Sequence, residues 1–171
     1  NMVLSLMARN ADLHIFPHDT PSDQVMACRP DALFISNGPG DPVHATDAIR
    51  CVKELAGTVP IFGICMGNQI CGLGLGAKTY KMKFGHRGTN QPVRYKDGSI
   101  YITTQNHGFA VADDTLPEGA NVLYSNVNDG TLEGFEDPYL EITCVQFHPE
   151  AHGGPRDTEI PFFDTMFRRL A

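Results

Sequence analysis

The sequence predicts an α/β fold in which a doubly wound, mostly parallel sheet carries helices on both of its faces. In the first half, short apolar runs alternate with stretches whose apolar residues recur every three or four positions, which is typical of alternating strands and helices. After Gly76 the pattern changes to short strand candidates separated by turn signals, so we expect short antiparallel strands to be added there. A chain of 171 residues is long enough for one domain with a sizeable core.

Composition and charge exclude several classes of protein. The net charge of −7 argues against a nucleic-acid groove, which needs clustered Lys and Arg. No apolar run approaches ~20 residues, so we expect no membrane span, and no signal peptide is evident. The five cysteines, at positions 28, 51, 65, 71 and 144, are scattered and typical of a reducing cytoplasm. All except Cys65 are expected to be small buried residues.

The first half should alternate helices with strands. Pro17 ends the second element, and Thr20 and Pro21 resemble the N-cap and the first residue of a helix. In order, the expected elements are a helix at 2–8, a strand at 12–16, a helix from 20, a strand at 31–36, a helix at 43–56, a strand at 59–64 and a helix at 66–75.

The second half should add antiparallel strands and close with a helix. Lys96-Asp97-Gly98 and Asn128-Asp129-Gly130 are turn signals between strands. The expected elements are strands at 78–84, 91–95, 99–104, 122–126, 132–135 and 142–147, and a helix at 157–170.

The run Val59–Ile64 leads into Gly63-x-Cys65-x-Gly67 and then into the helix at 66–75. Strand, sharp turn and helix is the layout of a nucleophile elbow, in which glycines leave room for a strained turn. Such a turn places Cys65 at the carboxyl edge of the sheet and at a helix N-terminus, where the helix dipole favours a thiolate. Alone, the motif fits a buried cysteine followed by helix-packing glycines equally well.

His148 and Glu150 supply a base and a carboxylate after the last strand. Pro149 should keep this segment extended, so that side chains two positions apart project to the same side, near Cys65. A cysteine, a histidine and a carboxylate that orients the histidine form the usual arrangement for thiol nucleophilic catalysis. Alone, the pair could be a capping histidine and a surface glutamate, but together with the elbow it predicts catalysis.

The glycine-rich loop at 36–41 follows the strand that should neighbour the Cys65 strand, at the edge where open α/β sheets bind ligands. Its glycines let backbone N–H groups approach a substrate, and we expect the N–H groups of Gly40 and Met66 to form an oxyanion hole. In isolation, the loop is also compatible with a plain strand-to-helix connection. No metal site is expected, because Pro149 denies His148 and His152 a helix and no cysteine joins them at ligand spacing.

Three motifs in this order and spacing resemble the class I (triad) glutamine amidotransferases, and the resemblance covers nearly the whole chain. They are Gly38-Pro39-Gly40-Asp41-Pro42, Gly63-Ile64-Cys65-Met66-Gly67-Asn68-Gln69 and Phe147-His148-Pro149-Glu150. The flavodoxin-like fold of that family agrees with the predicted sheet. The stretches 76–88, 105–110 and 149–157 further resemble the small, glutamine-hydrolysing subunits of carbamoyl phosphate synthase, and they are more specific than the triad motifs.

The resemblance implies that Cys65 attacks the side-chain amide of glutamine, that His148 protonates the departing ammonia and that Glu150 orients His148. Water would then hydrolyse the glutamyl thioester. Ammonia would pass to a large synthetase subunit, which makes carbamoyl phosphate for arginine and pyrimidine biosynthesis. The resemblance also implies that ATP and Mg bind to the large subunit, so that this chain needs no cofactor of its own. A cytoplasmic location is expected. By the same resemblance, the residues that contact glutamine are Gly38, Gly40, Met66, Gln69, Asn106, Gly108 and Phe109.

The chain departs from the family at two places. Asn68 stands where the family usually has His, and the family's first strand and the N-terminal domain of the small subunit would precede Asn1. Residues 1–171 are therefore expected to be a single amidotransferase domain. Two alternatives stay open: the amidotransferase part of another synthetase, for anthranilate or GMP, and a catalytically silent scaffold. The basic stretch Lys78–Arg87 is expected to be either a solvated face or a partner contact.

Overall fold

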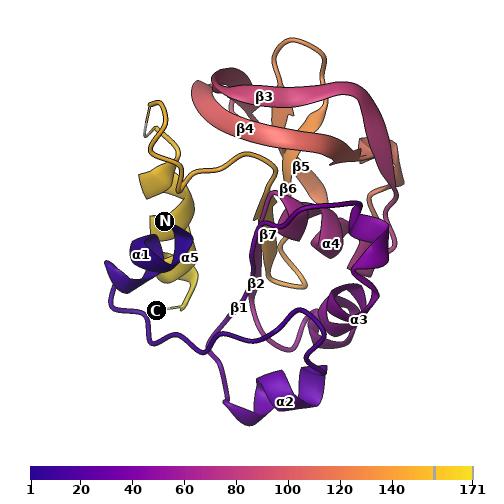
Figure 1. The fold of residues 1–171 in the computed structure, drawn as a ribbon, viewed down its shortest axis with the longest axis vertical. Coiled ribbons are helices and arrows are strands. Elements are labelled where there is room, and N and C mark those ends of the chain that lie inside the picture. Colours follow the sequence, from indigo (N-terminus) through magenta and orange to yellow (C-terminus); the bar gives the residue numbers. More distant parts are fainter. Residues whose placement is uncertain (156, 171) are drawn as a thin grey trace.

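The computed structural model describes residues 1–155 and 157–170, whose strands form one mixed sheet (Figure 1). The sheet has the order β1-β2-β7-β6-β5-β3-β4. The parallel part consists of β1 (Leu33–Ile35), β2 (Ile61–Ile64) and β7 (Ile142–Val145). The antiparallel part consists of β6 (Leu132–Asp137), β5 (Asn121–Asn126), β3 (Thr79–Tyr95) and β4 (Ile100–Val111).

Helices cover both faces of the parallel strands, as the sequence predicted (Figure 1). One face carries α1 (Met2–Met7) and α5 (Glu159–Leu170), and the other carries α3 (Thr46–Leu55) and α4 (Met66–Gly74). The remaining helices are α2 (Ser22–Ala27) and two 3₁₀ turns, η1 (Pro42–His44) and η2 (Asp113–Thr115). Within the described residues, no helix has the length and apolar character needed to cross a membrane.

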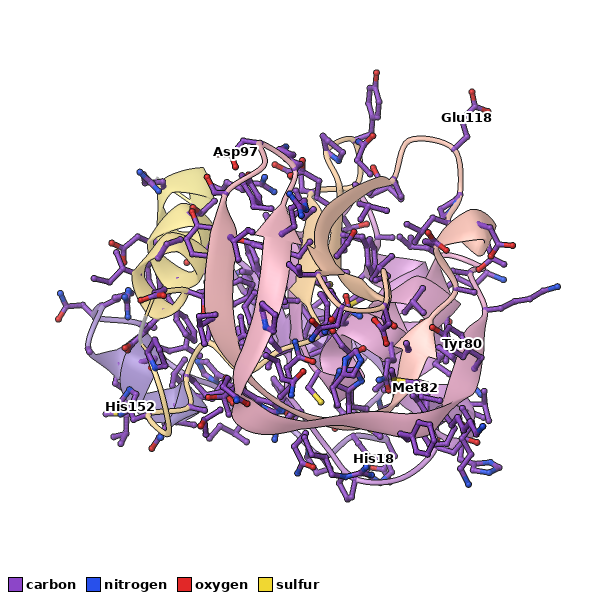
Figure 2. The ribbon with its side chains drawn as sticks, turned by 90° about the horizontal axis from the view of Figure 1, so that it is seen from above. His18, Tyr80, Met82, Asp97, Glu118 and His152 are labelled. Atoms are coloured by element: carbon purple, nitrogen blue, oxygen red, sulfur yellow. The ribbon has the colours of Figure 1, made fainter. Side chains whose placement is uncertain are left out.

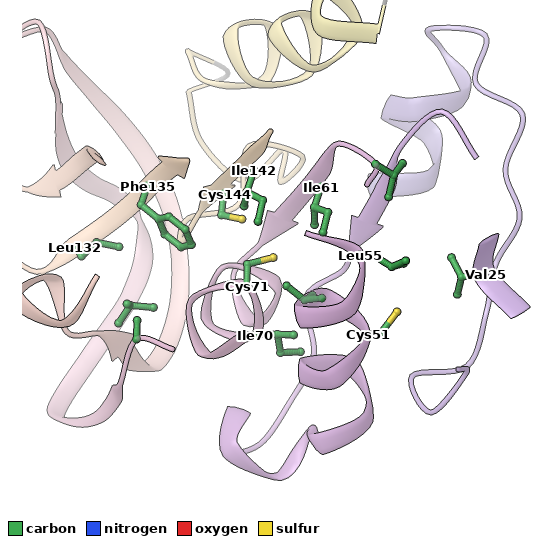
Figure 3. Close-up of a cluster of buried hydrophobic side chains, with 14 residues drawn as sticks. Val25, Cys51, Leu55, Ile61, Ile70, Cys71, Leu132, Phe135, Ile142 and Cys144 are labelled. Atoms are coloured by element: carbon green, nitrogen blue, oxygen red, sulfur yellow. The ribbon is translucent and has the colours of Figure 1, made fainter. Parts of the chain in front are cut away.

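The sheet separates two apolar clusters. Ile61 points to the α3 and α4 face, where it belongs to a cluster with Leu55, Cys71 and Ile142 (Figure 3). The next residue, Phe62, points to the opposite face and packs in the cluster that contains the α5 residues. Every residue of β2 and β7 is buried, as expected for strands covered on both faces. The parallel strands are therefore a rigid base for the residues that follow their carboxyl ends.

Three expectations for the first half need correction. Residues 12–16 are not a strand: they pair with no strand of the sheet, and Ile15 stays 78% exposed as a result. Helix α2 begins at Ser22, with Pro21 rather than Thr20 at the N-cap position. The helix expected at 43–56 is divided: η1 ends at His44, the φ of −80° and ψ of 50° of Ala45 are not helical, and α3 begins only at Thr46.

In the second half, the antiparallel strands are longer than expected. The two strands expected at 78–84 and 91–95 are one strand, β3, which bulges twice instead of ending. Strand β4 continues to Val111, well beyond the strand expected at 99–104, so that Asn106, His107 and Gly108 belong to a strand rather than to a polar loop. Figure 2 shows Tyr80 and Met82 toward one end of β3 and Asp97 at the turn that joins β3 to β4. The ribbon reaches the carboxyl edge of the parallel strands, because the His148 N–H, just beyond the end of β7, donates to the Thr104 carbonyl of β4 at 2.8 Å.

Candidate active site

Cys65 occupies a strained turn between β2 and α4. Its φ of 56° and ψ of −104° are unusual for a residue with a Cβ. The Cys65 N–H donates to the Val145 carbonyl at 2.8 Å, which extends the β2–β7 pairing into the turn. A Cβ on Gly63 would lie 2.7 Å from the Gly67 backbone, and one on Gly67 would lie 2.1 Å from the Ile35 carbonyl oxygen. The two glycines are therefore required for the elbow that the sequence predicted.

His148 and Glu150 meet each other, but not on an extended segment as expected. Strand β7 ends at Val145, and the chain then turns, with the Ala151 N–H donating to the His148 carbonyl at 3.2 Å. His148 Nδ1 nevertheless lies 2.9 Å from Glu150 Oε1. The turn achieves the contact because Pro149 has a φ suited to the second position of such a turn.

The surroundings of His148 favour its charged form. Burial lowers the pKa of His148, but hydrogen bonding to Cys65 and to Glu150 outweighs burial and raises this pKa to about 10. Since Cys65 is only 5% exposed and Glu150 only 6%, bulk water screens these interactions weakly. The sulfur, imidazole and carboxylate thus form one buried, interacting set, with the imidazolium as its resting state at neutral pH.

A cleft of about 820 Å³ opens over this set. Its walls come from the loop after β1, from the start of α4 and from the β3–β4 ribbon. The predicted site residues that line it are Gly38, Gly40, Cys65, Met66, Gln69, Asn106, Gly108, Phe109 and His148. Glu150 lies behind His148 rather than in the wall. All the residues predicted to act at one site are therefore brought together.

Two of these residues are fixed by a buried amide network. The Gln69 side-chain nitrogen donates to the Phe109 carbonyl at 2.8 Å and to Gln146 Oε1 at 3.0 Å. Asn68 Nδ2 donates to the same Gln146 oxygen at 3.2 Å. Helix α4 is thereby tied to β4, on the opposite wall of the cleft. Asn68, at the position where the sequence departs from the family pattern, is fully buried and does not line the cleft.

Sequence reasoning missed several residues of the cleft. Lys81, Lys83 and Arg87 of the basic stretch line it, in addition to His107. The signal that could have found them is the pair Gly85 and Gly88, whose positive φ angles allow β3 to bulge over the site rather than end. Cys28 was wrongly expected to be buried, whereas Cys51, Cys71 and Cys144 are buried as predicted. All five cysteines are free thiols.

Comparison with known proteins identifies the family. The family model of class-I glutamine amidotransferases matches residues 1–166. The chain belongs to this family. Two solved structures agree with the fold assignment of this amidotransferase. A Thermoplasma acidophilum protein, described as a putative component of GMP synthase, superposes with a TM-score of 0.80 at 23% identity, covering 98% of this chain and 88% of that one. A glutamine amidotransferase of Thermotoga maritima gives 0.71 at 18% identity, with 98% and 77% covered.

Curated relatives of this amidotransferase are more similar in sequence. The carbamoyl phosphate synthase small chain of Methanosarcina mazei is 51% identical over 99% of this chain and 47% of its own length. The small chain of Methanocaldococcus jannaschii is 49% identical over 98% of this chain and 48% of its own length. The chain thus spans about half the length of the curated relatives that it matches.

Proposed function

We propose that this amidotransferase hydrolyses glutamine to glutamate and ammonia, and that the ammonia is used by a carbamoyl phosphate synthase large subunit. The observation that carries the proposal is the buried contact of Cys65, His148 and Glu150 at the floor of a cleft. The roughly 50% identity to carbamoyl phosphate synthase small chains supports the choice of partner.

In the proposed reaction, Cys65 is the nucleophile. A charged His148 supplies the counter-charge that a thiolate needs, and the thiolate sulfur attacks the side-chain amide carbon of glutamine. The developing oxyanion would be stabilised by backbone N–H groups of Gly40 and Met66. Met66 suits this role because it begins α4, where backbone N–H groups lack partners within the helix. His148 then gives its proton to the leaving nitrogen, which departs as ammonia.

The second half of the reaction restores the site. Water attacks the glutamyl thioester while neutral His148 takes one of its protons. The carbon–sulfur bond breaks, glutamate leaves, and Cys65 is again paired with the imidazolium. Glu150 holds the Nδ1 side of His148, so that Nε2 is free to exchange protons with the sulfur, the leaving nitrogen and water.

The remaining cleft residues are proposed to hold the substrate. Asn106, Gly108 and Phe109 come from β4, and Gln69 comes from α4, so that glutamine would lie between the two walls. Gly38 and Gly40 bring the backbone of the third wall close. ATP and Mg would be bound by the large subunit, and a cytoplasmic location is supported by the five free thiols.

The test is glutamate release by the small subunit in complex with its large subunit. Cys65→Ser should lower the rate by about a thousandfold or more, because it removes the nucleophile without changing the shape of the site. Equal rates of glutamate release by the wild type and this variant would mean that the chain is a catalytically silent scaffold. Supplying ammonia from ¹⁵N-labelled glutamine to carbamoyl phosphate, GMP and anthranilate synthetase partners in turn tests the choice of partner, since only carbamoyl phosphate should acquire the label.

A further inference from the structure

One wall of the cleft lacks the support of a regular strand ladder. On β3, four residues (82–85) stand between Lys81 and His86, whereas on β4 only Gly108 stands between their partners Phe109 and His107. A second irregularity follows between Gly88 and Gln91. The pairs from His86 to Gly88 are therefore a short ladder isolated between two bulges. Few backbone hydrogen bonds hold the ladder between residues 86–88 and 105–107, so we infer that side-chain contacts are needed to fix its position.

A buried cluster lies directly behind this wall. Glu133 of β6 is fully buried, and its Oε1 lies 2.9 Å from His86 Nδ1 and accepts from Asn126 Nδ2 at 3.1 Å. His86 Nε2 lies 3.0 Å from Asp129 Oδ2. The other oxygen of Glu133, Oε2, has no hydrogen-bond partner among the residues that the structure describes. The charge of this buried carboxylate therefore depends on His86 for its compensation.

The charges in the cluster are consistent with that pairing. Hydrogen bonding to Glu133 raises the pKa of His86 to about 9, so that the ring is cationic at neutral pH. Burial raises the pKa of Glu133, while the hydrogen bonds from His86 and Asn126 oppose this effect. Glu133, His86 and His107 are close enough together to ligate a metal. The 2.9 Å contact between His86 and Glu133 is, however, the length of a hydrogen bond with a shared proton.

His107 connects the cluster to the cleft. Its ring lies edge-on to that of His86, with 5.0 Å between centroids, and its Nε2 lies 3.8 Å from Glu133 Oε1. On its other side, Nδ1 lies 2.9 Å from the Phe109 carbonyl, the same oxygen that accepts from Gln69 at 2.8 Å. This carbonyl joins the ribbon to the helix that begins at Cys65. The nearest polar neighbour of His107 Nε2 is Gln105 Oε1, at 3.1 Å, so Gln105 orients the His107 ring while the His86 ring packs against it. The His107 ring, held between His86 and the Phe109 carbonyl, thus helps to fix the backbone between Asn106 and Phe109.

We propose that Glu133 and His86 are positioning residues for glutamine binding, acting through His107 on the Asn106–Phe109 wall. The inference rests on the proposed glutaminase function. Neither Glu133 nor His86 lines the cleft, so neither is expected to touch substrate or to take part in proton transfer. Their loss should let the wall shift, which weakens the binding of substrate and transition state alike and leaves the chemical step unchanged.

The test compares variants of the small subunit in complex with its large subunit. Glu133→Gln keeps the shape of the side chain and removes its charge, and His86→Asn removes the compensating cation. Each should raise the KM for glutamine roughly tenfold or more, because small displacements of binding groups are costly, with kcat within about twofold of the wild type. Glutamine affinity of the same variants in a Cys65→Ser background, measured by calorimetry, should fall by the same factor.

Glu136→Gln is the matched control. Glu136 lies on the same strand, is buried and pairs with Lys96 and Arg169, but it does not contact the ribbon wall. Its substitution should lower the melting temperature without changing the KM. If His86→Asn, which leaves the buried Glu133 carboxylate without its cation, folds too poorly to assay, Glu133→Gln carries the comparison, because it keeps the shape of the side chain and removes the buried charge. If the assayed variant has an unchanged KM and an unchanged affinity for glutamine, the positioning role is wrong but the proposed glutaminase function still stands. If the wild type neither binds nor hydrolyses glutamine, both the proposed function and the positioning role are wrong.

Discussion

Replacing Gly67 by alanine should break the elbow more severely than any other small change in α4. A Cβ at this position would lie 2.1 Å from the carbonyl oxygen and 2.9 Å from the carbonyl carbon of Ile35. An ordinary carbon–oxygen contact is about 3.3 Å, so α4 and β1 would have to separate by roughly 1 Å. Both groups are backbone, and no side-chain rotation relieves the clash. We expect a loss of about 3 kcal/mol of stability, at the upper end for overpacked cores.

Gly72→Ala on the same helix is the control for this change. Its Cβ would meet Val111 Cγ2 at 3.1 Å, a side-chain atom that can move by a few tenths of an ångström. The better helix propensity of alanine, worth about 1 kcal/mol in a helix interior, should offset that contact. The stability of Gly72→Ala should therefore stay close to that of the wild type.

The assay is thermal unfolding followed by far-ultraviolet circular dichroism, since the chain contains no tryptophan. For a domain of this size, a 3 kcal/mol loss lowers the melting temperature by roughly 6–12 °C. Gly67→Ala should also lose glutaminase activity at temperatures where it is still folded, because the displaced helix carries Cys65 away from His148. Equal melting temperatures for the two alanine variants would refute the reasoning that backbone contact at Gly67 holds the elbow.

The other predictions concern pH and thiol reactivity. Because the pKa of His148 is raised to about 10, glutamine hydrolysis should persist to that pH and decline above it. Glu150→Gln removes one of the contacts that raise this pKa, so it should shift the decline in activity to lower pH. A pH profile that does not shift would exclude that role for Glu150. The pKa of His86 is raised in the folded state, so its stabilisation is complete below about pH 6.5 and is lost as the pH rises through about 9. Urea unfolding of the wild type should show that the free energy of unfolding falls by at most roughly 3 kcal/mol as the pH rises through this range. The His86→Asn variant should not show this fall. A glutamine-like electrophile should label Cys65, and glutamine should block this labelling. A small general alkylating agent should also label the exposed Cys28. If mass spectrometry finds the glutamine-like reagent on the buried cysteines, an activated Cys65 is contradicted.

The parts of the fold that the sequence predicted best are those with local causes. The elbow follows from an apolar strand, two glycines and a helix within about a dozen residues, and each of these signals is readable without knowing the partner strands. The meeting of Cys65, His148 and the loop at 36–41 follows from one topological rule, because the carboxyl ends of neighbouring parallel strands share an edge.

The parts that were missed depend on contacts between distant segments. Separate strands were expected at 78–84 and 91–95, yet Gly85 and Gly88, with positive φ angles, allow bulges within one continuous strand. Residues 12–16 have the composition of a strand but no partner among the described residues, so composition alone was misleading. The role of Glu133 could not be predicted because its partners lie on β3, β4 and β5, and no local pattern reveals their convergence.

The hydrogen bond from Cys65 to Val145 joins the nucleophile to the end of β7, and only two fully buried residues, Gln146 and Phe147, separate Val145 from His148. The pairing of β2 with β7 therefore sets the distance between the Cys65 sulfur and the His148 imidazole. Among the described residues, no exposed loop lies between the two groups along this path. Heating or denaturant should therefore leave turnover intact until the sheet itself melts, so that inactivation and global unfolding follow a single curve.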